Sequence, residues 1–328
     1  MAVLVTMIMM MGLGSAATVG VTAGAIIIPL LIGLGFSPAV AAAAVLMGTY
    51  GGIPFNPMGS FYLMAVEADP TGQATGKEMI NAGFMSAVVC VFVVLVLFTL
   101  CCNLMSKRGE ADLEAARRAM EKAENFKVNK LNVALTLSPM ILILAAVYGP
   151  LDEKVFTVPF CMFMGFAFSL LRWRKDYKEV ATAFFKGQGE AFFGIITLMA
   201  SAAVFAKGME DIGIVEAIVG AMKVNPSLSK ISATVFPAMM GALSGSGNAP
   251  TIAFIESILP HAYEIGVDYN GLASLVIKTG SYGRTFSPVA AVTIIVCGIA
   301  KAEPLQVIKL TVVPAVAVAV ITMILTPM

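Results

Sequence analysis

The chain has 328 residues, of which 59% are apolar and only 12% are charged, and its mean hydropathy is +0.90. Soluble domains carry about 25% charged residues, so this composition excludes a soluble globular protein and indicates an integral membrane protein. A net charge of +1, one histidine and five cysteines without metal-ligand spacing give no support to nucleic-acid binding or to a metal cofactor.

The first 105 residues are predicted to begin with a broken apolar segment. Residues 1–35 are expected to form a re-entrant helical hairpin with its tip at residues 14–18, because a single span, the alternative, would carry glycine, serine and threonine at its centre. Ser37 and Pro38 predict the start of a helix over 37–66, which breaks near 48–54 and restarts at Asn56. Residues 79–105 are long enough for a membrane span.

A charged loop at 106–130 separates this part from residues 131–328. In the second part we expect scaffold spans within 131–206, an interfacial helix at 208–223 and a second hairpin at 230–266. A second broken helix at 271–300 and a last span at 305–325 follow. The second hairpin has the tip GALSGSGNAPT, where Asn248 before Ala249 and Pro250 predicts a helix start.

The two halves contain an internal repeat. Aligning Gly14 with Gly245 requires no gap for 21 residues, and GTYGGIPFNP and GSYGRTFSP follow at 34 and 35 residues. Of the 21 lysines and arginines, seven lie in 106–130 and five in 172–186, which places both loops in the cytoplasm. Counting spans from these loops makes the two repeats inverted.

We therefore predict an all-α polytopic membrane protein with inverted repeats, each with a re-entrant hairpin and a broken transmembrane helix. This is the architecture of secondary transporters. The second repeat has 114 residues between Leu131 and its tip, whereas 13 residues precede Gly14. The first repeat therefore lacks a scaffold half, which implies either a truncated chain or a second polypeptide.

Arg284 is the leading candidate for substrate binding. A charge in a helix break within a membrane is costly and usually functional, and a guanidinium holds a carboxylate with two hydrogen bonds. Its repeat counterpart is Gly52, so the fold itself does not require a cation there. The alternative is that Arg284 binds carbonyls freed at the break. Lys278 lies near the same break. Its alternative roles are to bind substrate, to extend its ammonium to the membrane surface, or to pair with another part of the chain.

Polar residues at the two tips and the two breaks complete the predicted site, with helix capping as the alternative role. The predicted substrate-binding residues are Arg284, Ser246, Asn248, Ser15, Thr18, Thr49, Asn56, Ser281, Thr285 and Ser287. The candidates for binding a coupling ion or proton are Ser244, Gly245, Gly247 and Glu256. Glu256 is equally compatible with a place at an interface.

Enzymatic activity is not expected. The sequence GSG around Ser246 superficially resembles an intramembrane serine protease, but the single histidine, His261, is fifteen residues away along the hairpin. An ion channel is less favoured than a carrier, because inverted hairpins are typical of alternating access.

Four segments carry a family resemblance: FAKGMEDIGIVEAIVG, SGSGNAPTIAFIESILP, GSYGRTFSPVAAV and AKAEPLQVIKLTVVPA. They resemble the DcuC family of anaerobic C4-dicarboxylate transporters, within the ion transporter superfamily. The resemblance implies a multi-pass carrier of the bacterial inner membrane for fumarate, succinate or malate, working by uptake, exchange or efflux. It also implies an elevator-type transport domain and a homodimer of the complete protein in membrane lipid.

A cation-coupled carrier of another small organic anion or an amino acid, in the same superfamily, is the alternative function. For a C4-dicarboxylate, one fixed cation does not neutralise two negative charges. A coupling ion, Na⁺ or H⁺, is therefore expected, with no other cofactor.

Overall fold

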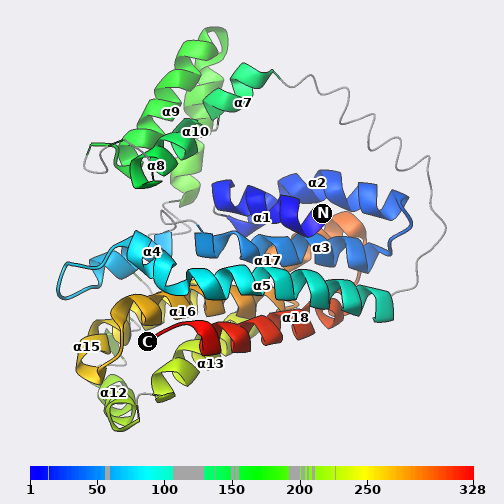
Figure 1. The fold of residues 1–328 in the computed structure, drawn as a ribbon. Coiled ribbons are helices and arrows are strands. Elements are labelled where there is room, and N and C mark those ends of the chain that lie inside the picture. Colours follow the sequence, from blue (N-terminus) through cyan, green and yellow to red (C-terminus); the bar gives the residue numbers. More distant parts are fainter. Residues whose placement is uncertain are drawn as a thin grey trace. The chain divides into compact units, whose positions relative to one another are not determined.

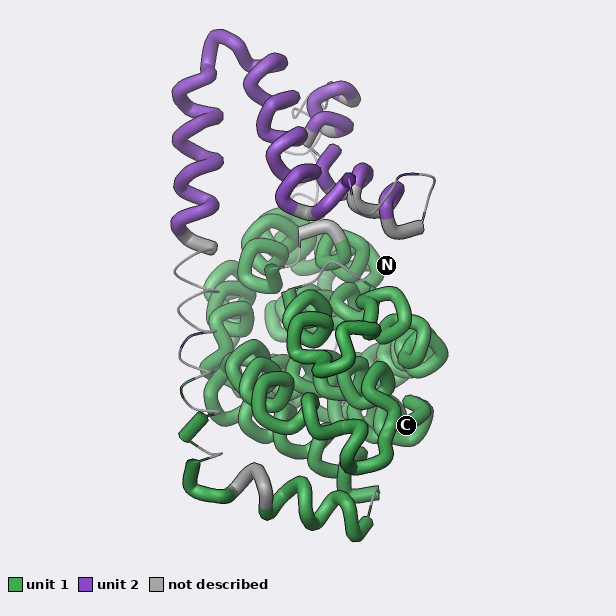
Figure 2. Tube along the Cα trace, turned by 90° about the vertical axis from the view of Figure 1, so that its left-hand side faces the viewer, with its two compact units in different colours: residues 1–125, 203–328 green, residues 126–202 purple. Residues whose placement is uncertain are grey.

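The computed structural model describes the chain except for residues 14, 56–59, 106–128, 137, 149–150, 152–154, 192–199, 201–203, 205–206, 209–210 and 226. All secondary structure within the described residues is helical. The chain divides into two compact units (Figure 2): a larger unit of residues 1–125 and 203–328, and a smaller unit of residues 126–202.

The first half of the larger unit follows the predicted order of helices. It contains α1 (Ala2–Leu13), α2 (Ala16–Gly33), α3 (Pro38–Gly51), a 3₁₀ turn η1 (Ile53–Phe55), α4 (Ser60–Glu67) and α5 (Gly76–Met105) (Figure 1). Ser15 caps α2 by accepting a hydrogen bond from the backbone N–H of Thr18, and Ser37 caps α3 in the same way. The predicted restart at Asn56 lies outside the described residues.

The second half of the larger unit contains the second predicted hairpin and broken helix. Its elements are α12 (Ile214–Val224), α13 (Ser227–Ser244), α14 (Asn248–Ser257), η4 (Leu259–His261), α15 (Ala262–Ile265), α16 (Tyr269–Thr285), α17 (Ala291–Ala300) and α18 (Pro304–Leu325). Asp268 caps α16 through the backbone N–H of Gly271 at 2.6 Å. Gly266, with φ of +80°, ends α15 in the left-handed conformation that glycine adopts without steric cost.

The smaller unit is a bundle of short helices: α7 (Lys130–Thr136), α8 (Ser138–Tyr148), α9 (Val158–Arg172), η2 (Arg174–Asp176) and α10 (Tyr177–Ala191). Phe166 of α9 stacks on Phe184 of α10, with ring centroids 4.0 Å apart. An alanine at Gly165 would meet the ring of Pro139, so this glycine lets α8 and α9 approach closely.

Two helices form the centre of the larger unit. Every residue of α3 from Ala39 to Gly51 is buried, and so is every residue of α16 from Gly271 to Gly283. A helix that is surrounded on all sides needs small side chains so that its neighbours can approach, which explains the alanine run of α3. The two helices meet where the ring of Tyr50 packs edge-on against the ring of Tyr282, at 5.1 Å between centroids.

The predicted hairpins pack on these central helices in corresponding ways. The first arms, α1 and α13, pack on α3 and α16 respectively. The second arms also pack on these helices, α2 on α3 and α14 on α16, and in addition α2 packs on α17 and α14 packs on α4. Each second arm therefore contacts the later half of the broken helix in the opposite half of the chain.

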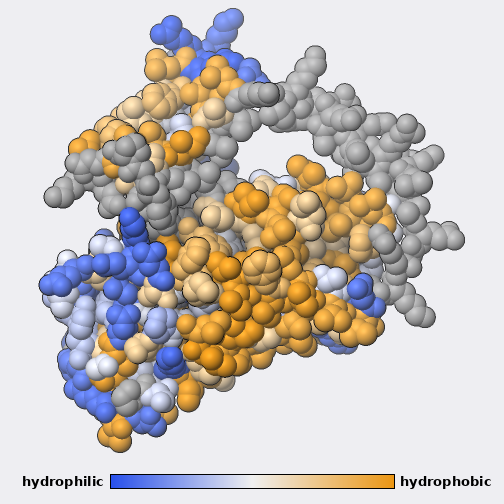
Figure 3. Space-filling view, in the orientation of Figure 1, coloured by the Kyte–Doolittle hydropathy of each residue, from blue (hydrophilic) through white to orange (hydrophobic). Residues whose placement is uncertain are grey.

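The larger unit has a lipid-compatible surface. Among the described residues, four stretches are long and apolar enough to cross a membrane: Ala16–Gly33, Pro38–Glu67, Gly76–Met105 and Pro304–Leu325. Figure 3 shows apolar side chains covering the face over α5 and α18, whereas the end formed by α4, α12 and α15 is hydrophilic. Exposed apolar side chains on α5 include Phe84, Phe92, Val96 and Leu100.

The loop between α4 and α5 is held by one carboxylate. Asp69 is only 7% exposed and accepts hydrogen bonds from the backbone N–H groups of Thr71, Gln73 and Ala74. The hydroxyl of Tyr263 donates a further one at 3.1 Å, which ties this loop to α15. Burial opposes ionisation of Asp69, but these hydrogen bonds outweigh it and lower its pKa to about 2.

Two features of the structure differ from what the sequence predicts. The sequence places Arg284 within the break of the second broken helix, but α16 continues through Gly280 and Gly283 to Thr285, and the interruption covers residues 286–290. The glycines thus serve packing rather than chain reversal. The arms of the first hairpin are also unequal, since α2, with 18 residues, is long enough by itself to cross a membrane.

Candidate functional site

The tip of the second hairpin is held by hydroxyl groups. The Ser246 hydroxyl accepts hydrogen bonds from the backbone N–H groups of Asn248 (3.3 Å) and Ala249 (3.5 Å), and the Ser244 hydroxyl donates to the carbonyl of Met240 at 2.7 Å. The prediction that Asn248 caps α14 is wrong, because Ser246 satisfies the first N–H groups and Asn248 is already helical. Its amide makes no hydrogen bond within the described chain, which leaves it available to a ligand.

A seam of glycines brings this tip against the end of α16. A β-carbon on Gly247 would lie 2.6 Å from the carbonyl oxygen of Gly280, and one on Gly241 would lie 3.1 Å from the same oxygen. Gly245 has φ of +70° and lies against the backbone of Val289, inside the break. These contacts are possible only without side chains, so the glycines fix the tip beside the break.

Arg284 lies at this seam, in the last turn of α16 rather than in the break itself. Its Nε and Nη2 atoms are buried, and neither has a hydrogen-bond partner among the described residues. The carbonyl-binding alternative therefore has no support in the described structure. Partial negative charge at the C-terminal end of α16 stabilises a cation at this position.

The corresponding position in the first half of the chain is filled differently. A β-carbon on Gly52, the repeat counterpart of Arg284, would lie 2.7 Å from the β-carbon of Met10 on α1. In the second half the hairpin residue is Gly241, and its missing β-carbon would lie 3.2 Å from the backbone nitrogen of Arg284. In the first half, the hairpin residue Met10 therefore faces a glycine, Gly52. In the second half, the hairpin residue is the glycine, Gly241, and it faces Arg284.

Several predicted hydroxyl ligands bind their own helix instead. The hydroxyl groups of Thr49, Ser281 and Thr285 are buried and donate to the carbonyls of Leu46, Ile277 and Ser281, respectively. Such back-bonding is usual for serine and threonine inside helices. Ser287, in the break, differs because its hydroxyl is buried and has no partner in the described part of the chain.

The remaining candidates fall into separate places. Ser15 and Thr18 bond to each other at the exposed start of α2, with 3.1 Å between their hydroxyls. Glu256 lies on α14, where its Oε2 atom is buried without a partner among the described residues. Asn56 lies outside the described residues. The structure thus brings together Arg284, the second tip and the break, but places no described contact between this group and the first tip.

Lys278 is not part of this group. Its ammonium is 1% exposed and donates to the carbonyl of Gly83 at 2.7 Å and to the hydroxyl of Ser86 at 3.1 Å, both on α5. The prediction that Lys278 pairs elsewhere therefore describes the structure better than substrate binding or snorkelling. No local signal in the sequence identifies α5 as its partner.

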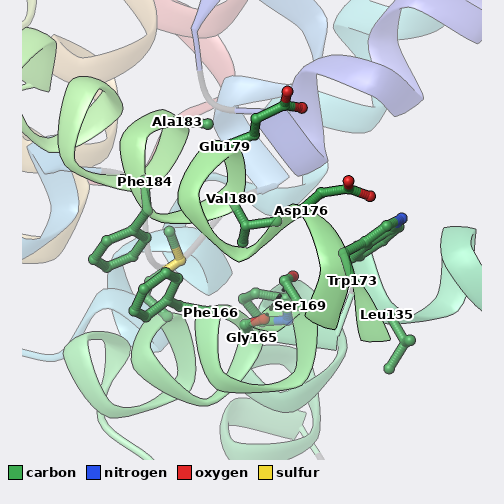
Figure 4. A pocket seen from close by; sticks show the side chains of 12 residues that line it. Leu135, Gly165, Phe166, Ser169, Trp173, Asp176, Glu179, Val180, Ala183 and Phe184 are labelled. Atoms are coloured by element: carbon green, nitrogen blue, oxygen red, sulfur yellow. Dashed lines mark hydrogen bonds between the residues drawn. The ribbon is translucent and has the colours of Figure 1, made fainter. Parts of the chain in front are cut away.

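The smaller unit contains a cavity of about 610 Å³ (Figure 4). Its walls are apolar and aromatic, with Phe166, Phe184 and Trp173, and its polar rim carries Asp176 and Glu179. Two carboxylates at a rim repel an anion. The Arg284 group, with an unpaired cation, an unpaired amide and the N-terminus of α14, has the chemistry that attracts one.

The whole chain is similar to known transporters. The model of the DcuC family, described as C4-dicarboxylate anaerobic carrier, matches residues 1–328. The chain is 27% identical over 343 aligned positions to the anaerobic C4-dicarboxylate transporter DcuC of Escherichia coli (strain K12), covering 98% of this chain and 70% of that protein. It is 29% identical over 238 residues to an uncharacterized transporter of Haemophilus influenzae, covering 70% of this chain and 82% of that protein.

Proposed function

The chain belongs to the C4-dicarboxylate anaerobic carrier (DcuC) family, which consists of transporters and not of enzymes. We propose that it is a secondary active transporter that carries fumarate, succinate or malate across the bacterial inner membrane, by uptake, exchange or efflux. The observation that carries this proposal is Arg284, a permanent cation with two buried, unpaired N–H groups beside a polar hairpin tip.

The geometry favours an anion with a planar carboxylate. Nε and one terminal nitrogen of a guanidinium form the fork that binds a carboxylate with two parallel hydrogen bonds. In the proposed complex, one substrate carboxylate occupies this fork at Arg284. The Asn248 amide supplies a further donor, and the positive end of the α14 dipole adds to the attraction for an anion.

Charge balance requires a coupling ion. A C4-dicarboxylate carries two negative charges, and Arg284 supplies one fixed positive charge. Moving an unbalanced charge through the low-dielectric interior of a membrane is costly, so a cation, Na⁺ or H⁺, accompanies the substrate. Glu256, with a buried and unpartnered Oε2 atom, and the tip residues Ser244, Gly245 and Gly247 remain the proposed places for that ion.

Inverted repeats account for several contacts of the larger unit. Tyr50 and Tyr282 occupy the same position in GTYGG and GSYGR, and they touch each other. In the proposed inverted arrangement, two equivalent residues that touch would lie near the axis that relates the repeats. Equivalent pairs also pack the same way, since Gly51 faces Met7 and Gly283 faces Ala238.

The proposed mechanism is of the elevator type. In it the larger unit, with both hairpins and both broken helices, moves as the substrate-carrying body. The smaller unit belongs to the scaffold, through which the complete protein forms a homodimer. The support for this division is the family resemblance and the separation of the chain into two compact units.

Transport assays test the proposal. The protein is reconstituted in liposomes loaded with unlabelled succinate, and the entry of labelled succinate is measured. We expect exchange in the wild type and in Arg174→Ala, which removes an exposed arginine of the smaller unit, and none in Arg284→Ala. Wild-type protein that is folded yet exchanges no dicarboxylate would overturn the proposal.

A further inference from the structure

The Lys278 side chain is an uncompensated cation in the core of the larger unit. Asp69 and Lys278 are the charged side chains that are buried among the described residues, and they lie in different places. The Lys278 ammonium binds one carbonyl and one hydroxyl, with no carboxylate among its described partners. A buried charge without a counter-ion costs several kcal/mol, so a merely structural contact is a poor reason for it.

Lys278 belongs to a ladder of polar side chains at the junction of α5, α16 and α18. One layer contains Lys278, Ser86 and Thr326, with 3.1 Å from the ammonium to the Ser86 hydroxyl and 3.2 Å from there to the Thr326 hydroxyl. Thr326 directly follows α18 and precedes the exposed Pro327. The layer thus links the buried ammonium to the end of the unit.

A second layer lies one helical turn further in. There Cys90, Tyr282 and Thr322 follow Ser86, Lys278 and Thr326 at a spacing of four residues on the same three helices. The Thr322 hydroxyl is 3.2 Å from the Cys90 sulfur and 3.2 Å from the Tyr282 hydroxyl. Tyr282 and Arg284 lie two residues apart on α16, so they belong to different faces of that helix.

Other titratable groups lie along this ladder. They are the Cys90 thiol on α5, the Tyr282 phenol on α16, the Tyr50 phenol on α3, whose ring packs on that of Tyr282, and Lys230 on α13, whose ammonium donates to the Thr326 carbonyl at 2.9 Å. From α18 only the two threonine hydroxyls are described.

The fold does not require a cation at this position. The repeat counterpart of Lys278 is Leu46, which is fully buried in α3. The Gly83 carbonyl also accepts a hydrogen bond from the Ser86 hydroxyl at 2.8 Å, so it keeps a partner without Lys278. An apolar residue of similar length can therefore replace Lys278 without leaving that carbonyl unpaired.

We propose that Lys278 carries the coupling proton of the transport cycle, an inference that rests on the proposed function. With dicarboxylate bound at Arg284, Lys278 is an ammonium and supplies the second positive charge. After the substrate leaves, the ammonium releases a proton through the hydroxyls of Ser86 and Thr326 to water, which becomes hydronium. The neutral amine then returns with the empty carrier, and the N–H bond re-forms when a proton comes back along the same path.

The test compares two transport modes in liposomes that contain the Lys278→Arg variant. Exchange of labelled for unlabelled succinate involves only the loaded carrier and needs no release of the proton. Net uptake driven by a pH gradient requires that release. We expect Lys278→Arg to lower pH-driven net uptake by about tenfold or more while exchange stays within about threefold of the wild type, because arginine keeps the charge of the loaded carrier but does not release its proton.

Controls separate the outcomes. Lys309→Met removes an exposed lysine of α18 and should leave both modes unchanged. Ser86→Ala keeps Lys278 but interrupts the path, and it should slow net uptake without changing exchange. Retained exchange shows that each variant is folded. Undiminished pH-driven uptake in both Lys278→Arg and Ser86→Ala, or wild-type net uptake that ignores a pH gradient, would overturn the proposal. A wild type without exchange would instead refute the proposed function.

Discussion

The glycine seam between the second hairpin and α16 offers a sharp prediction. Gly247 has φ of −74°, a conformation that alanine adopts freely, so Gly247→Ala introduces no backbone strain. The new β-carbon would lie 2.6 Å from the Gly280 carbonyl oxygen and 3.0 Å from its carbon, both backbone atoms. Because neither can rotate away, the tip has to move by several tenths of an ångström.

The expected cost follows from overpacking. Forcing an extra methyl group into a close-packed site destabilises a protein by about 1–3 kcal/mol. The displaced tip also carries Ser246 and Asn248 away from Arg284, so succinate affinity should fall together with stability. Thermal denaturation and calorimetric titration of purified protein measure the two effects.

Gly298→Ala is the matched control. Gly298 lies in α17, and a β-carbon there meets no atom within 4 Å. Alanine stabilises a helix relative to glycine by about 0.5–1 kcal/mol, so this variant should be as stable as the wild type or more so. If Gly247→Ala matches Gly298→Ala in both stability and affinity, the seam does not position the tip.

Three further predictions concern other parts of the larger unit. Gly83→Ala should lower the thermal denaturation midpoint clearly, because its β-carbon would collide with Lys278 Nζ and Ser274 Oγ; an unchanged midpoint would contradict the buried position of Lys278. Asp69→Asn should cost about 1–2 kcal/mol of stability at neutral pH, after a discount for nearby solvent. The reason is that the pKa of Asp69 is about 2 in the folded protein, whereas its ordinary value is 3.8. A depressed pKa makes this contribution complete above pH 3.8 and removes it as pH falls through about 2, so denaturation followed against pH should show the two proteins converging in acid. Ser246→Ala should cost about 1 kcal/mol through the lost cap of α14, whereas Asn248→Ala should leave stability nearly unchanged but weaken succinate binding.

The sequence predicts the order of the helices because its signals are local. Ser37 and Pro38 start α3 by a capping rule that needs no knowledge of the fold. The tip of the second hairpin was located for the same reason. The choice between Ser246 and Asn248 as its cap depends on backbone angles that composition does not specify.

Long-range contacts are what the sequence does not reveal. The bonds from Lys278 to Gly83 and Ser86 join positions more than 190 residues apart. The continuation of α16 through Gly280 and Gly283 depends on the hairpin that packs against those glycines, so local propensity alone predicts an earlier break. Likewise, Thr49 and Ser281 are polar in sequence but bind their own helix once buried.

The most direct test of the account is succinate binding by Arg284 variants. Arg284→Lys keeps the charge but loses the fork, so affinity measured by titration calorimetry should weaken by about 1–3 kcal/mol. Arg284→Ala should bind no measurable succinate yet remain folded, because Gly52 fills the equivalent position of the first half. Unchanged succinate affinity in Arg284→Ala would contradict the claim that this arginine holds the substrate.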